Sequence, residues 1–115
     1  MKKIAVIFGI ILLAAACGSK SKGEAEVEKL YAQGQLALNQ AKYDSALAVY
    51  DTILKKFPNH PKNDRALFML AYIEKEFLGN DAKAEQYLND LIARYPKSDL
   101  IKDAKFLLSG QPPKI

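Results

Sequence analysis

Two stretches of the chain carry the hydrophobic pattern of an amphipathic helix. In each, apolar residues recur at spacings of three and four, which places them along one helical face. The first set is Tyr43, Ala46, Leu47, Tyr50, Ile53, Leu54 and Phe57, and the second is Ala84, Tyr87, Leu88, Leu91, Ile92 and Tyr95. Each stretch ends in an aromatic residue before proline, which disfavours helix in the residue preceding it. We therefore predict helices that end near Phe57 and Tyr95.

A further helix is predicted before each of these two, and a fifth after them. Residues from Glu24 to about Gln40 place their apolar side chains on one side. Residues from Pro61 to about Leu78 are apolar nearly all round, so this helix must be covered on more than one side. The fifth helix runs from Ser98, as its N-cap, to about Ser109. Gly79 and Asn80 supply a C-terminal glycine and an N-cap between the third and fourth helices.

The helices repeat with a constant offset of 38 residues. This offset carries Ala46, Tyr50, Ile53, Phe57 and Pro58 onto Ala84, Leu88, Leu91, Tyr95 and Pro96, and Ala66, Phe68 and Leu70 onto Ala104, Phe106 and Leu108. A fixed spacing over many anchors indicates a true repeat. The order is helix A, helix B, helix A, helix B, helix A, and the last helix covers the open end of the stack.

The first 16 residues have the pattern of a signal peptide. Lys2 and Lys3 precede an apolar run from Ile4 to Ala16. A run of this length fits a signal peptide, whereas a spanning helix needs roughly 20 residues. The small residues before Cys17 resemble a bacterial lipobox, in which the cysteine thiolate takes up a lipid before cleavage. The alternative is a buried core cysteine behind an ordinary N-terminal helix.

This resemblance implies a division of the chain into four parts. Residues 1–16 would be the signal peptide, and residues 17–23 the lipidated Cys17 with a flexible tether rich in Gly and Ser. Residues 24–110 would form the helical domain, and residues 111–115 a tail. Because Cys17 is the only cysteine, no disulfide can form within the chain.

Composition and single residues argue against several functional classes. The net charge of +4 falls to +2 without residues 1–16, too mild to indicate a nucleic-acid partner. No glycine-rich phosphate loop is present, and no small-molecule substrate is expected. His60 is the only histidine and has no cysteine or carboxylate cluster near it, so neither a metal site nor catalysis is expected. Asp64, four residues on, is its predicted partner. The covalent lipid is the only expected non-protein group.

The repeat resembles the tetratricopeptide repeat. Gly34, Tyr43, Ala46, Tyr50, Ile53 and Pro58 fall at the spacings of that pattern of about 34 residues. In the second copy, Ala71 is the best equivalent of Gly34, which leaves the register of that helix open by one residue. The longer junctions are similar to those of bacterial envelope lipoproteins, such as the outer-membrane assembly lipoprotein and the Tol-Pal coordinator. The resemblance implies an all-α fold, a short α-solenoid of about two repeats plus a C-terminal capping helix.

The same resemblance implies a groove lined by helix A of each repeat, which binds a partner protein or peptide. The implied groove residues are Glu28, Tyr31, Gln35, Leu38 and Asn39 in the first repeat, and positions near Ala66, Met69, Ile73 and Phe77 in the second. An aromatic ring and a thioether can adapt to varied side chains. Packing between repeats is the alternative, favoured for Met69 and as well supported as groove lining for Tyr31.

These observations predict a membrane-anchored adaptor in the cell envelope with no enzymatic activity. The alternative is a structural subunit of an outer-membrane protein assembly or envelope-maintenance complex. Gly18 is not the aspartate that retains lipoproteins in the inner membrane of some bacteria. We therefore expect an outer-membrane location facing the periplasm. In a bacterium with a single membrane, the protein would lie on the outer face of the cytoplasmic membrane.

Overall fold

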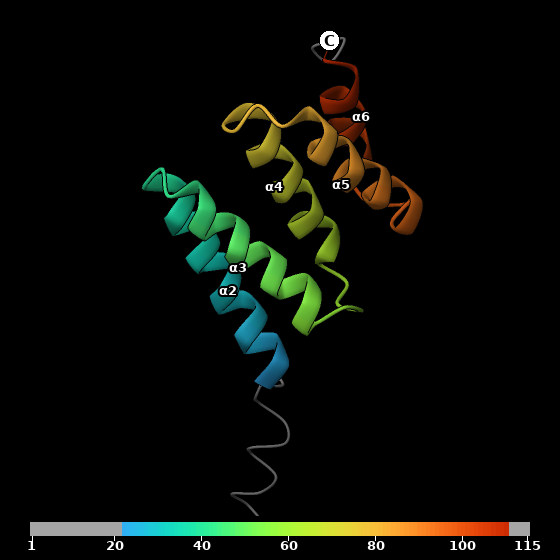
Figure 1. Cartoon of the computed structure of the whole chain (residues 1–115). Helices are drawn as coiled ribbons and strands as arrows, with labels where there is room; N and C mark the ends of the chain where they lie inside the picture. Colours follow the sequence, from blue (N-terminus) through green and yellow to red (C-terminus); the bar gives the residue numbers. More distant parts are fainter. Residues whose placement is uncertain (1–21, 111–115) are drawn as a thin grey trace, which may run out of the picture.

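The computed structural model describes residues 22–110, which form five α-helices in that part of the chain (Figure 1). They are α2 (Lys22–Asn39), α3 (Tyr43–Lys56), α4 (Asn63–Glu76), α5 (Asp81–Arg94) and α6 (Ile101–Ser109). Each helix packs on the next one along the chain, so that α2 pairs with α3 and α4 with α5. The predicted all-α solenoid of two repeats and a final helix is confirmed.

Two buried clusters form the core. The first lies among α2, α3 and α4, and its buried members are Ala37, Ala46, Tyr50, Ile53, Ala66, Leu70 and Ile73. The second lies among α4, α5 and α6, and its buried members are Leu67, Ala71, Ala84, Leu88, Leu91, Ala104 and Leu107. Leu54 and Tyr87 pack against both clusters. Because α4 contributes to both, it is covered on two sides, as its apolar pattern predicts.

The repeat offset of 38 residues is confirmed by burial. In four of the predicted pairs both members are almost completely buried, whereas Leu70 is buried and its equivalent Leu108 is half-buried. The four pairs are Ala46 and Ala84, Tyr50 and Leu88, Ile53 and Leu91, and Ala66 and Ala104. The two B helices therefore present equivalent faces to the core.

Most helix ends lie where the sequence places them. Asn80 is the N-cap of α5, and its side chain accepts a hydrogen bond from Lys83 N at 3.3 Å. Gly79 and Gly110 have left-handed backbones, with φ of 67° and 70°, which glycine adopts without steric cost. Ala41, between α2 and α3, is also left-handed at φ 59°.

Three helices differ from the prediction at one or both ends. The helix predicted from Pro61 to about Leu78 is shorter at both ends, and α2 begins two residues before Glu24. Ser98 is not the N-cap of α6, because Leu100 holds that position. Ser98 instead orders the preceding turn, where its Oγ accepts from Leu100 N at 3.0 Å and donates to Asp64 Oδ2 at 2.6 Å.

The junctions that follow the two B helices are linked to each other. Arg94, at the end of α5, donates from Nη2 to the carbonyl oxygen of Pro58 at 3.2 Å. The bond from Ser98 to Asp64, in the first turn of α4, links the second junction to the helix that follows the first. Within residues 22–110, no helix has both the length and the apolar character that a membrane span requires.

Candidate partner-binding groove

One pocket brings together residues predicted for the groove in both repeats. It has a volume of about 480 Å³ and lies between α2, α3 and α4. Its lining residues are Tyr31, Ala32, Gln35, Tyr50, Arg65 and Met69, and we call it the groove pocket. Three predicted residues, Tyr31, Gln35 and Met69, therefore share one site. Its volume lies within the range of roughly 300–1,000 Å³ of known ligand pockets.

Tyr31 both packs against the core and lines the groove pocket. Its ring lies 6.0 Å from that of Tyr50, between centroids, with the planes tilted by 58°. Its hydroxyl donates a hydrogen bond to the carbonyl oxygen of Lys62. Burial raises the pKa of Tyr31 well above its usual value, although a hydrogen bond to the backbone of Ala66 lowers it in part. The neutral phenol is therefore the stable form. Packing is confirmed for Tyr31, while its role in binding a partner stays a prediction.

Gly34 allows Tyr50 to form the base of the groove pocket. A Cβ atom at Gly34 would lie 2.7 Å from Cζ of Tyr50, closer than such atoms approach in proteins. Tyr50 is almost completely buried, with 1% of its surface exposed. The small residue in α2 thus makes room for the aromatic ring of α3, as the repeat pattern implies.

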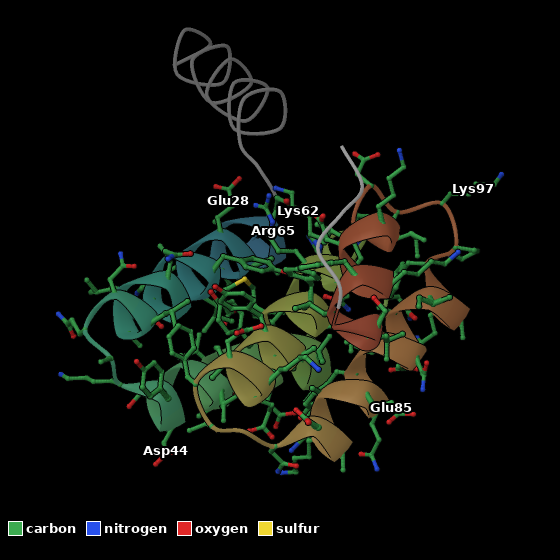
Figure 2. All side chains as sticks on the ribbon, turned by 90° about the horizontal axis from the view of Figure 1, so that it is seen from above. Glu28, Asp44, Lys62, Arg65, Glu85 and Lys97 are labelled. Carbon is green, nitrogen blue, oxygen red and sulfur yellow. The ribbon has the colours of Figure 1, made fainter. Side chains whose placement is uncertain are left out.

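Met69 is half-buried and lies at the boundary between core and groove. It packs against the first buried cluster and also lines the groove pocket. Arg65, one turn before it in α4, is exposed at the same pocket, and within residues 22–110 its guanidinium forms no ion pair. In Figure 2, the labelled residues Glu28, Lys62 and Arg65 lie close together at one edge of the helical domain.

The groove positions predicted at Ala66 and Ile73 are wrong, since both residues are completely buried in the first cluster. The reason is the register of α4. Ala71, buried in the second cluster, corresponds to Gly34 at an offset of 37 residues rather than 38. With this register, Glu28 corresponds to Arg65. Aligning the small residues would have identified Arg65, which the groove prediction missed.

Four other predicted positions do not line the groove pocket. Glu28 and Asn39 are exposed, and Asn39 Oδ1 accepts a hydrogen bond from Gln35 Nε2 at 3.0 Å. Leu38 is half-buried and packs against the first cluster. Phe77 is 43% exposed, but its ring stacks on Tyr43 with centroids 4.6 Å apart. Gln35 therefore links the groove pocket to the exposed end of α2.

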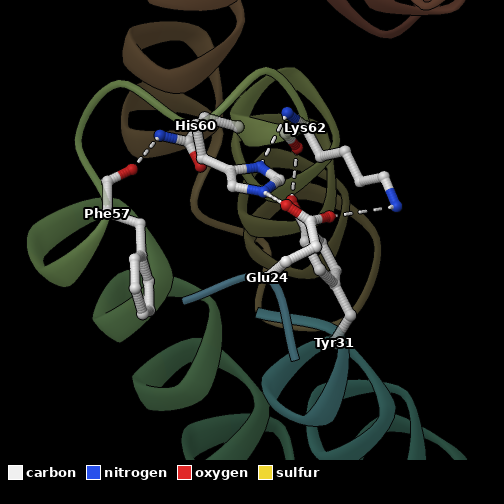
Figure 3. Close-up of polar contacts among 6 residues, drawn as sticks. Glu24, Tyr31, Phe57, His60 and Lys62 are labelled. Carbon is white, nitrogen blue, oxygen red and sulfur yellow. Dashed lines mark hydrogen bonds and ion pairs between the residues drawn. The ribbon is translucent and has the colours of Figure 1, made fainter. Parts of the chain in front are cut away.

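A polar network holds the start of α2 against the loop that precedes α4 (Figure 3). His60 Nε2 lies 2.8 Å from Glu24 Oε2, and the other ring nitrogen, Nδ1, accepts a hydrogen bond from Lys62 N at 3.1 Å. Lys62 Nζ lies 4.0 Å from Glu24 Oε1. Because the carbonyl oxygen of Lys62 accepts from Tyr31, the network reaches the groove pocket. The predicted partner Asp64 is wrong: His60 pairs with Glu24, which lies 36 residues away.

The asparagine that begins α4 completes this loop. Asn63 is completely buried, and its Nδ2 donates to the carbonyl oxygen of Phe57 at 2.6 Å. Its Oδ1 has no hydrogen-bond partner in the described part of the chain. The bond to Phe57 fixes the end of α3 to the beginning of α4.

Other predicted features can be placed only in part. Among residues 22–110, no three His, Cys, Asp or Glu side chains are grouped so that they could hold a metal ion. Cys17, the signal peptide, most of the tether and the tail at 111–115 lie outside the described residues. Lipidation of Cys17 therefore stays a prediction.

Comparison with known families agrees with this geometry. No curated protein and no solved structure matches the chain. The model of one family, described as Tetratricopeptide repeat, matches residues 31–99, which is more than half of the chain. The match runs from Tyr31 in α2 through the end of α5 and so covers most of both helix pairs. The chain belongs to the tetratricopeptide repeat family, whose repeats are protein-interaction modules.

Proposed function

We propose that this protein is a lipid-anchored adaptor that binds a peptide segment of another envelope protein in the groove pocket. The family supports protein binding in general. The observation that carries the choice of surface is the pocket itself, which is open at residues from both repeats. An adaptor of this kind has no catalytic role, and no cofactor is needed for binding.

The lining of the groove pocket supports a peptide as the ligand. The ring of Tyr31 and the thioether of Met69, above the buried ring of Tyr50, give an apolar surface that can adapt to different side chains. Gln35 and Arg65 add polar groups at the same surface, and such groups fix the orientation of a bound chain. An extended segment that inserts one apolar side chain fits this arrangement.

The anchor rests on the sequence around Cys17. A basic start, an apolar run and small residues before a single cysteine support lipidation there. The domain begins at Lys22, and the five residues from Cys17 to that point span at most roughly 18 Å when extended. The groove pocket would then lie close to the membrane surface, so partners near the membrane would be favoured. Gly18 supports the outer membrane as the location, with the outer face of the cytoplasmic membrane as the alternative.

A permanent structural role is the second candidate. Phe77 and Leu78 leave 43% and 42% of their surfaces exposed at the turn between α4 and α5. Exposed apolar side chains of this size are compatible with a lasting interface. A subunit of an outer-membrane assembly would co-purify at fixed stoichiometry, whereas an adaptor would exchange its partner.

Crosslinking in the native envelope tests the groove pocket. Ala32→Glu places a charged side chain in the pocket from an exposed helical position, and we expect it to reduce partner capture at least tenfold. Gln33→Glu adds the same charge one residue on, outside the pocket, and should leave capture unchanged. Equal capture by the two variants would contradict the proposed binding surface.

Mass spectrometry of the protein from its membrane fraction tests the anchor separately. We expect residues 1–16 to be absent and Cys17 to carry the lipid. A chain that retains Met1 and a free thiol would contradict the anchor, while partner capture would still report on the groove pocket.

A further inference from the structure

Another pocket opens on the opposite side of α4 from the groove pocket. It has a volume of about 360 Å³ and lies between α3, α4 and α5. Its lining includes Leu47, Asp51, Leu70, Glu74, Lys83 and Tyr87, and we call it the Glu74 pocket. It shares no lining residue with the groove pocket. Because α-helical residues follow one another at about 100°, Glu74 lies half a turn around α4 from Arg65.

Glu74 is a buried residue whose carboxylate has no cationic partner within residues 22–110. Only 4% of its surface is exposed, yet it lines the pocket. Among residues 22–110, its carboxylate takes part in none of the ion pairs, and no hydrogen bond satisfies it. Among the described residues, the one fully buried side-chain atom without a hydrogen-bond partner is Asn63 Oδ1, so the carboxylate oxygens of Glu74 open onto the pocket. This position therefore favours binding of a cation from outside the described chain.

The charged groups that line the pocket beside Glu74 do not supply it with a cation. Asp51, on α3, lines the same pocket and pairs with Lys55, with Oδ2 and Nζ 2.8 Å apart at the exposed rim. Lys83 also lines the pocket, but it is exposed and forms no ion pair with Glu74. Two carboxylates thus face the pocket, and in the described part of the chain the inner one has no counterion.

The pKa of Tyr87 is affected by the negative charges of both carboxylates. Burial raises the pKa of Tyr87, and the nearby charges of Asp51 and then Glu74 raise it further, against an opposing effect of Lys55. Both carboxylates therefore act on one phenol at the pocket, and that phenol stays protonated. The inner wall is accordingly suited to a positive group beside an aromatic ring.

The shape and chemistry of the Glu74 pocket select the cation. No three metal-binding side chains are grouped within residues 22–110, which leaves an organic cation as the group that this set would take. Leu47 and Leu70 offer apolar surface to an aliphatic stem. A guanidinium is less strongly hydrated than an ammonium, pairs with carboxylates through two parallel hydrogen bonds and stacks on aromatic rings. We propose that the Glu74 pocket binds an arginine side chain of a different polypeptide, with Glu74 as its carboxylate acceptor.

Titration with small arginine ligands tests this assignment on the full-length chain in detergent micelles. The ligand is N-acetyl-arginine amide, and the neutral, nearly isosteric N-acetyl-citrulline amide is its control. We expect saturable NMR shifts at the amides of Asp51, Glu74 and Tyr87 with arginine, and at least tenfold weaker binding of citrulline. Equal binding of the two ligands, or no saturation with arginine, would overturn the proposal without any variant being needed.

Matched variants locate the acceptor. Glu74→Gln removes the charge and keeps the shape, and it should weaken arginine binding at least tenfold. Glu76→Gln removes an exposed carboxylate two residues along the same helix and should leave binding unchanged. Arginine binding that survives Glu74→Gln in a folded protein contradicts the assignment.

Two further results separate this proposal from others. Ala32→Glu, which obstructs the groove pocket, should not alter arginine binding, so the two surfaces can fail independently. A dimer of the wild-type chain that Glu74→Gln dissociates would show that the arginine comes from a second copy. That result would overturn the assignment to a different polypeptide.

Discussion

The two helix pairs differ in the side chains that fill the contact between helix A and helix B. Where helix A contacts helix B, the first repeat combines Gly34 with Tyr50, and the second combines Ala71 with Leu88. Tyr50 and Leu88 are equally buried, at 1% exposure each. Only the longer aromatic side chain, however, reaches past helix A to line the groove pocket with Tyr31. The comparison teaches that moving volume from one helix to the other can keep a repeat intact while it changes which residues line the groove pocket.

The largest expected effect comes from removing the large partner in the second repeat. Leu88→Ala should lower the free energy of unfolding by about 3 kcal/mol, because it leaves a cavity in a completely buried site. The groove pocket should be unaffected in the protein that remains folded. Urea denaturation followed by circular dichroism measures the loss.

Leu78→Ala is the matched control for this variant, since Leu78 is 42% exposed. We expect a change within about 0.5 kcal/mol. Equal losses in the two variants would mean that Leu88 is not part of a tightly packed core.

The next effect tests the small residue of the first repeat. Gly34→Ala should destabilise the protein by about 2 kcal/mol, because its Cβ would lie 2.7 Å from Tyr50 Cζ and the ring cannot move freely. Gly23→Ala is the control, because a Cβ there lies 3.4 Å from Phe57 and should be tolerated. Thermal unfolding compares the two.

The double variant Gly34→Ala with Tyr50→Leu converts the first repeat to the combination found in the second. We expect part of the stability lost in Gly34→Ala to return, while partner capture through the groove pocket falls. If the double variant is as unstable as the sum of the two single variants, the two positions are not coupled and the comparison is incorrect.

A smaller effect concerns the start of each B helix. Asn80 caps α5 through its side chain, whereas Lys42 occupies the same position before α3 and makes no cap hydrogen bond. Their backbones are similar, with φ and ψ of −98° and 80° for Asn80 and −92° and 74° for Lys42. Lys42→Asn should therefore stabilise the protein by about 1 kcal/mol, and Asn80→Ala should destabilise it by a similar amount. Chemical denaturation that shows no gain for Lys42→Asn would contradict this equivalence.

The smallest effect appears only at alkaline pH. Burial raises the pKa values of Tyr31 and Tyr50 in the first repeat and of Tyr87 in the second. A group whose pKa is raised by folding contributes stability below its unfolded pKa, which is about 10 for tyrosine, and this contribution is lost as the pH rises further. Tyr31→Phe should therefore flatten the fall in the free energy of unfolding above pH 10. Parallel stability curves for wild type and variant would contradict a contribution from Tyr31.

The sequence predicts the helices and much of the core because both follow from local spacing. The residues that face the core in α3 and α5 recur every three to four positions, and their burial is confirmed at Ala46, Ile53 and Leu91. The register of α4 does not follow in the same way. That helix is apolar on nearly all sides, so the pattern does not distinguish Ile73, which is buried, from Met69, which is half-buried and lines the groove pocket.

Contacts between segments far apart in the chain could not be predicted from the sequence, for a different reason. His60 pairs with Glu24 rather than with Asp64, because the loop after α3 folds back onto the first turn of α2. The carboxylate of Glu74 also gives no signal in the sequence, where it looks like an ordinary surface charge on α4. Its burial depends on the packing of both α3 and α5 against α4.

The network at the start of α2 has a mechanical consequence. Any pull on the chain before Lys22 enters the fold at the first turn of this helix. There, Glu24 bonds to His60, and Glu26 bonds to Lys56 at the end of α3. The force would be shared among the first turn of α2, the loop that contains His60 and the end of α3. It would therefore not act on α2 alone. A domain built in this way resists unfolding when a force is applied at its N-terminal side.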